Sequence, residues 1–123
     1  MRTLAFDGQT GASGDMILGA LVAAGADPDV LAPVEGALDL TYRIGETTCE
    51  GVSATTVDVV LDDGTPAEGH GPHRTRTEVV DVVDGMALPG TVAREARAIF
   101  DLLADAEAAV HGTDDGPVRF HEE

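Results

Sequence analysis

The stretch Phe6-Asp7-Gly8-Gln9-Thr10-Gly11-Ala12-Ser13-Gly14-Asp15-Met16 decides how the rest of the chain can fold. It joins a short apolar run, residues 4–6, to a strongly apolar run, residues 16–24, which has the length of a helix. The stretch therefore predicts a strand, a glycine loop and the start of a helix. Glycine tolerates positive φ and lets other groups approach the backbone, so the loop can turn sharply and leave its amides facing outward. Such amides at a helix N-terminus can bind an anion.

The loop matches neither of the common nucleotide-binding motifs. A Walker loop needs a lysine after its last glycine, and the chain contains no lysine; the dinucleotide fingerprint is G-x-G-x-x-G, whereas the spacing here is G-x-x-G-x-x-G. Two carboxylates, Asp7 and Asp15, bracket the loop instead, and they suit a hard divalent cation that bridges to a phosphate. In the alternative interpretation, Ser13 caps the helix and Asp15 complements its dipole.

Turn-forming residues divide the first half of the chain into separate elements. Gly25 is expected to end the first helix. Asp27-Pro28 then predicts the N-cap and first position of a short second helix. Residues 42–49 and 53–61 are rich in β-branched side chains, and Glu50-Gly51 lies between them. This pattern predicts a β-hairpin.

The second half of the chain predicts a loop, two helices and a last strand. Residues 62–74 are polar and rich in glycine and proline, which is typical of a loop. The sequence Thr75-Arg76-Thr77-Glu78 matches a capping box that opens a short helix ending at Gly85. A long helix is expected over residues 89–110 and a strand over residues 117–122. The resulting order, β-α-α-β-β-α-α-β, predicts an α/β two-layer sandwich in which helices cover a small mixed sheet that contains the hairpin.

The composition limits the classes of partner and location. A chain of 123 residues suits one domain, residues 1–123. With 23 acidic residues and seven arginines the net charge is −16, which argues against nucleic acid or an anionic membrane as a partner. The longest apolar run, residues 16–26, is about half of what a bilayer needs. Cys49 is the single cysteine, so no internal disulfide can form and a cytoplasmic location fits.

Several segments together resemble one known family. Phe6-Asp7, the run from Thr10 to Met16, and Leu18-Gly19-Ala20-Leu21 are similar to the opening of the LarC-type nickel insertion proteins. Three later segments agree in order, namely His70-Gly71-Pro72-His73-Arg74, residues 98–112 with Val110-His111-Gly112 at their end, and Phe120-His121-Glu122. The resemblance therefore covers the whole chain.

The resemblance implies a function that the residue pattern alone does not give. The family inserts nickel into a pyridinium bisthiocarboxylate mononucleotide, using CTP, to complete a nickel-pincer cofactor, which is a lyase-class cyclometallase reaction. Nickel would be the substrate ion, and Mg or Mn with CTP would bind to a C-terminal part beyond residues 1–123. The implied partners are the mononucleotide precursor and a C-terminal domain or chain, while association with a second copy of this chain stays open. The chain would then be the N-terminal part of a longer architecture.

The resemblance also implies roles for individual residues. The expected catalytic residues are Asp7, Asp15, His121 and Glu122, those expected to bind the cofactor are Gly11, Ser13 and Gly14, and those expected to bind the metal are His70 and His73. Imidazole is a borderline-soft ligand that suits nickel or zinc. In the alternative interpretation the two loop histidines are simply exposed.

Two functions of other classes stay open beside nickel insertion. The bracketing carboxylates of the glycine loop would also suit a metal-dependent phosphate-ester binder or hydrolase. Alternatively, the chain is a non-catalytic assembly module that supplies a domain to a separate C-terminal partner.

The acidic composition generates a prediction about salt. Many carboxylates on one small domain repel one another when little salt screens them, and such surfaces are typical of proteins from halophilic hosts. The melting temperature should therefore rise steeply between low and molar potassium chloride. Thermal melts followed by circular dichroism would measure this rise, and an unchanged melting temperature would remove the halophilic interpretation.

Overall fold

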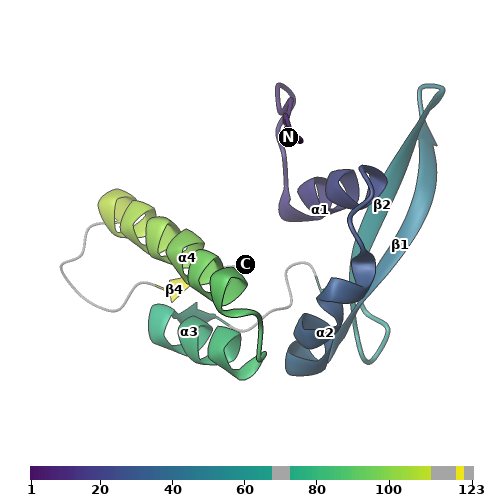
Figure 1. The fold of residues 1–123 in the computed structure, drawn as a ribbon. Helices are drawn as coiled ribbons and strands as arrows, with labels where there is room; N and C mark the ends of the chain where they lie inside the picture. Colours follow the sequence, from purple (N-terminus) through teal and green to yellow (C-terminus); the bar gives the residue numbers. More distant parts are fainter. Residues whose placement is uncertain (68–72, 112–118, 121–123) are drawn as a thin grey trace.

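The computed structural model describes residues 1–67, 73–111 and 119–120, which form helices and two small sheets (Figure 1). The elements follow one another as α1 (Gly14–Ala23), the 3₁₀ helix η1 (Pro28–Leu31), α2 (Ala32–Leu38), β1 (Leu40–Cys49), β2 (Val52–Leu61), β3 (Arg74–Thr75), α3 (Arg76–Gly85), α4 (Gly90–His111) and β4 (Arg119–Phe120). The predicted mixed α/β class is therefore confirmed. In the described part of the chain, no helix is long and apolar enough to cross a membrane.

The elements gather into two halves (Figure 1). In the hairpin half, residues 14–61, α1 and α2 lie on the same side of the β1–β2 hairpin. In the helix-pair half, residues 74–111 with 119–120, α3 packs against α4 beside the short β3–β4 sheet. Helices thus form one layer over the hairpin, as predicted for a two-layer arrangement.

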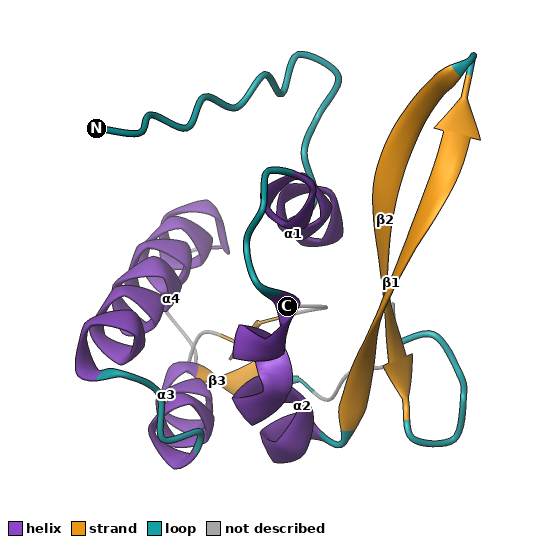
Figure 2. Ribbon diagram, turned by 45° about the vertical axis from the view of Figure 1, so that its right-hand side comes forward, coloured by secondary structure: helices purple, strands orange, loops and turns teal. Residues whose placement is uncertain are grey.

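The strand predicted over residues 4–6 is wrong for this structure. Residues 1–13 contain no strand and run as a loop away from the hairpin (Figure 2), with Leu4 64% and Phe6 60% exposed. A strand needs a neighbour for its backbone groups. The chain that follows β2 occupies part of the edge of β2 at which such a strand could pair. There, the Ala67 N–H donates to the Val59 carbonyl at 2.9 Å. Instead of one mixed sheet, the described residues form two antiparallel two-stranded sheets.

The hairpin turns through two residues, as predicted. Cys49 pairs with Val52, so Glu50 and Gly51 form the whole connection between the strands. Their φ angles are 49° and 81°, both positive. Two residues with positive φ are the signature of the type I′ turn, whose twist matches that of the flanking strands. Gly51 adopts this conformation at little cost because it has no Cβ.

The helix ends confirm several predictions from local sequence. After α1, Gly25 has φ 103°, its N–H donates to Val22, and the Ala26 N–H donates to Leu21, which together form a Schellman motif. The Asp27 side chain caps η1 by accepting from the Asp29 amide at 3.0 Å. Before α3, the Thr75–Glu78 capping box is complete in both directions.

Helix α1 is held to strand β2 by a close approach of backbone to backbone. Gly19 is buried, and a Cβ built at this position would lie 2.9 Å from the carbonyl oxygen of Thr55. Val57 of β2, which is 4% exposed, is the buried side chain next to this contact. A residue larger than glycine would therefore push α1 away from the hairpin.

The helix-pair half has its own small core. Val79 and Val83 of α3 pack with Ala93 and Ala104 of α4, and Phe100 lies partly buried against them. Two ion pairs join the same helices at the surface, one between Arg76 and Asp101 at 2.5 Å and one between Arg97 and Asp84. Because the side chains of both pairs are about half exposed, solvent screens them and each pair adds little to stability. Packing of the apolar cluster therefore stabilises the α3–α4 contact more than the ion pairs do.

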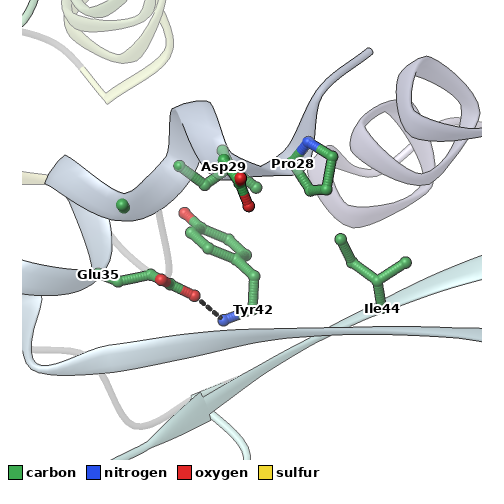
Figure 3. A pocket seen from close by; sticks show the side chains of 7 residues that line it. Pro28, Asp29, Glu35, Tyr42 and Ile44 are labelled. Atoms are coloured by element: carbon green, nitrogen blue, oxygen red, sulfur yellow. Dashed lines mark hydrogen bonds between the residues drawn. The ribbon is translucent and has the colours of Figure 1, made fainter. Parts of the chain in front are cut away.

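Tyr42 joins α2 to β1 (Figure 3). Its backbone N–H donates to Oε1 of Glu35 at 2.8 Å. Burial of the half-buried phenol raises its pKa above the ordinary value of 10.0, and the nearby Glu35 carboxylate raises it further. The neutral phenol is thus favoured in the folded chain. Its contribution to stability is fully present below the unfolded pKa and is lost as pH rises through the higher folded pKa.

Gly19→Ala should destabilise the chain by about 1–3 kcal/mol, since the new methyl group meets a backbone atom that cannot rotate away. The matched control is Gly36→Ala in α2, where an added Cβ meets no atom within 4 Å. There, removing a glycine from a helix should stabilise by about 0.5–1 kcal/mol. Denaturant unfolding of both variants measures the difference, and equal effects would contradict the close approach.

Glu35→Gln should lower the pKa of Tyr42 part of the way toward its ordinary value, because burial, the larger cause, remains. Tyr42 is the only tyrosine, so its absorbance near 295 nm can be titrated without interference. Glu46→Gln, an exposed change on the same strand, is the control and should leave the titration unchanged. An unchanged pKa in Glu35→Gln would show that burial alone causes the shift.

Candidate functional site

The glycine loop before α1 forms a tight turn at the surface. The Gly11 N–H donates to the Gly8 carbonyl at 2.9 Å, and Gly11 has φ 99°, a conformation that suits glycine. Residues 7–15 are all exposed. The loop is therefore open to a ligand from solvent, and α1 begins at its end with Gly14.

Ser13 and Asp15 form the polar centre of this loop. Ser13 occupies the N-cap position of α1, but its side chain accepts no capping hydrogen bond; its hydroxyl donates to Oδ1 of Asp15 instead. This hydrogen bond is the main cause of a lowered pKa of Asp15, and the backbone amides of Met16 and Asp15 lower it as well. The interpretation of Ser13 as a side-chain cap is therefore wrong. Asp15 is held as a carboxylate in the first turn of a helix.

Asp7 lies at the other end of the loop. Its Oδ1 accepts from the Gln9 N–H at 3.4 Å, a local turn interaction. Hydrogen bonds thus join Asp7 to Gln9 and Asp15 to Ser13 within separate parts of the loop. A metal or phosphate shared by the two carboxylates stays a prediction.

Each histidine segment has one described residue that pairs in the small β3–β4 sheet. His73 is exposed and directly precedes β3, and Arg74 pairs with Phe120 of β4. His70, His121 and Glu122 lie outside the described residues. His111 is the last residue of α4. Within residues 1–67 and 73–111, no three His, Cys, Asp or Glu side chains cluster closely enough to hold a metal ion.

A first cavity lies beside Tyr42, under η1 and α2 (Figure 3). Its volume is about 440 Å³, and its walls are Pro28, Asp29, Leu31, Ala32, Glu35, Tyr42 and Ile44. The Glu35 carboxylate that faces this cavity already accepts the Tyr42 amide. Asp29 and the phenol of Tyr42 line the cavity as well, so more of its lining is polar than apolar.

A second and larger cavity separates the two halves of the fold. Its volume is about 840 Å³, and we call it the central cleft. One wall comes from η1, α2 and Tyr42, and the other comes from α3, α4 and the chain between them. Most of the walls are apolar, and Arg74 and Asp29 are the charged residues that line it. Such a cavity lies within the size range of small-molecule sites, about 300–1,000 Å³.

Sequence patterns did not reveal either cavity. Each is formed by segments far apart in the chain, and neither periodicity nor capping signals report how such segments approach. Arg74 was the one charged lining residue of the central cleft that the sequence motifs included, because it ends the segment His70-Gly71-Pro72-His73-Arg74. Its place in an apolar wall follows only from the way in which the helix-pair half lies across the cleft from η1 and α2.

Comparison with known proteins identifies the family of the chain. The family model described as "Nickel insertion protein" matches residues 4–123. A pyridinium-3,5-bisthiocarboxylic acid mononucleotide nickel insertion protein of Akkermansia muciniphila is 40% identical over 135 residues, covering 99% of this chain and 32% of the relative. A protein of the same name from Geobacillus kaustophilus is 34% identical over 129 residues, covering 99% of this chain and 31% of its own length.

A third relative, from Methanococcoides burtonii and also named for nickel insertion, is 36% identical over 123 residues. The chain spans about a third or less of the length of these relatives, 30% in this last case. No solved structure matches the chain. Since the family match extends over nearly every residue, the chain belongs to the nickel insertion protein family.

Proposed function

We propose that the chain serves as the N-terminal segment of a nickel insertion protein that completes a nickel-pincer cofactor. The observation that carries this proposal is the family match over residues 4–123. Two relatives are named for nickel insertion into pyridinium-3,5-bisthiocarboxylic acid mononucleotide, so the substrate of this chain would be that mononucleotide or a close analogue. Nickel is then a substrate ion rather than a resident cofactor.

The glycine loop would bind the phosphate end of the mononucleotide or a cation attached to it. Support comes from the exposed loop, from the turn closed by Gly11, and from the ionised state of Asp15. Gly14 and Ser13 would contribute backbone amides at the N-terminus of α1, where an anion is favoured. Asp7 and Asp15 would hold the cation, since carboxylates are hard oxygen ligands.

The histidines would deliver nickel from solvent. The pairing of Arg74 with Phe120 supports a common location for the two histidine segments. His73 precedes Arg74 and His121 follows Phe120, and neighbouring Cα atoms are about 3.8 Å apart. We therefore group His70 and His73 with His121 and Glu122 as candidate ligands, because nickel accepts both imidazole and carboxylate.

The remaining steps of the reaction would lie in the part of the architecture that this chain does not span. CTP and its Mg or Mn ion would bind there, and a lyase-class reaction would need both parts. A cytoplasmic location, indicated by the single cysteine, belongs to the same proposal.

A second candidate function, an assembly module, is favoured by the surface of α4. Three large apolar side chains of this helix are well exposed, with Ile99 at 65%, Leu102 at 71% and Val110 at 78%. Exposed apolar patches commonly mark interaction sites. The chain covers about 30% of its relatives, so a further domain of the same architecture would be the natural partner for this face.

Nickel binding tests the proposal directly. The chain should bind nickel weakly and reversibly, and acid should release the ion, because imidazole binds metals only in its neutral form. His70→Ala combined with His73→Ala should weaken binding by at least about tenfold, or ~1.4 kcal/mol. Calorimetric titration at two pH values measures both effects.

His111→Ala is the control, since His111 ends α4 and should contribute little. Undiminished binding in the double variant would exclude the loop and leave His121 and Glu122 as the ligands. A wild-type chain that binds no nickel would contradict the proposed role of this segment.

A further inference from the structure

We propose that the central cleft binds the planar ring of a pyridinium carboxylate, with Arg74 pairing with the acid group. This inference rests on the proposed function for its choice of ligand, and on the cleft itself for its place. The cleft has about 840 Å³ of space between the hairpin half and the helix-pair half, in a region where β3 lies between α2 and α3 (Figure 2). That volume is sufficient for a mononucleotide-sized molecule.

Arg74 is the cation of the cleft. It is half-buried in β3 and lines the cavity, and it forms no ion pair with any carboxylate of residues 1–67 or 73–111. Arg2, Arg43 and Arg94 also form no ion pair within these residues, but all three are exposed, whereas Arg74 is half-buried in the wall of the cleft. A guanidinium in an apolar wall gains most from an anion that brings two oxygens in one plane, as a carboxylate does.

The other walls suit a flat ring that carries positive charge. Tyr42 from β1 and Phe100 from α4 line opposite halves of the cleft, and aromatic faces attract both rings and cations. Asp29 of η1 is the second charged residue of the lining. A purely anionic ligand would be repelled by Asp29, whereas a pyridinium ring places a positive charge within the ligand. Arg74 and Asp29 together therefore favour a ligand with both signs of charge.

A ring bound in the cleft would also account for two exposed apolar side chains in its walls. Val30 of η1 is 66% exposed and Val92 of α4 is 47% exposed, and both line the cleft. A ring that enters the cleft would cover these side chains and remove apolar surface from water. Binding would thus join the two halves of the fold through the ligand.

The test uses two probes that differ in one group. Nicotinate mononucleotide carries a pyridinium ring and a carboxylate, and nicotinamide mononucleotide carries the neutral amide in the same position. Calorimetric titration of the 123-residue chain should show at least about tenfold tighter binding of the acid, because only the acid forms a charge-assisted pair with Arg74. Arg74→Gln should abolish this preference, as in a double-mutant cycle.

Matched variants separate binding in the cleft from a general effect of the protein's charge on ligand affinity. Arg43→Gln removes an exposed arginine of β1 outside the cleft and should leave the preference unchanged. Val92→Glu adds a carboxylate to the cleft wall and should weaken binding of the acid at least about tenfold. Ile99→Glu makes the same change two turns along α4, outside the cleft, and should leave binding unchanged. Circular dichroism melts confirm that each variant is folded.

The outcomes for the cleft and for the proposed function are distinct. Failure of both probes to bind, or equal preference in wild type and Arg74→Gln, would overturn the cleft assignment even if nickel binds. Arg74-dependent binding of the acid by a chain that binds no nickel would support the cleft and remove the nickel role.

Discussion

The approach of Gly19 to the carbonyl oxygen of Thr55 is the contact on which the arrangement of the hairpin half depends. It lets α1 lie directly on β2, with the buried side chain of Val57 beside the contact. The chain has few aromatic residues, 3% of the total, so large side chains are not available to hold the helix at a greater distance. Close contact between backbones, rather than large side chains, holds α1 to β2. Interiors packed in this way tolerate little added volume.

A second consequence of this composition is that the buried apolar residues of the two halves do not join into one core. Val57 and Val60 are buried in the hairpin half, while the cluster around Val79 and Val83 belongs to the helix-pair half. These small side chains do not fill the space between the halves, and the central cleft lies there. The central cleft, a candidate ligand site, therefore lies where these small side chains leave space unfilled.

Local signals predicted local structure well. The capping box at Thr75-Arg76-Thr77-Glu78, the stop at Gly25 and the turn at Glu50-Gly51 each act through hydrogen bonds or φ angles within a few residues. The strand over residues 4–6 failed because a strand depends on a partner elsewhere in the chain, and a short apolar run does not show whether one exists. Asp15 could be recognised from its position after the glycine loop, whereas the hydroxyl of Ser13 turned toward it instead of the helix amides. The central cleft and the place of Arg74 in it depend on contacts between distant segments.

Tyr42 lines both cavities, and the chain contains one tyrosine and no tryptophan. Its ultraviolet emission therefore comes from a single known position between the two halves. Any change in the packing of η1 and α2 against the hairpin, or in the filling of either cavity, alters the surroundings of that one fluorophore. The wild-type chain thus carries a built-in optical reporter at the junction of its halves, and no label or added tryptophan is needed to follow movements there.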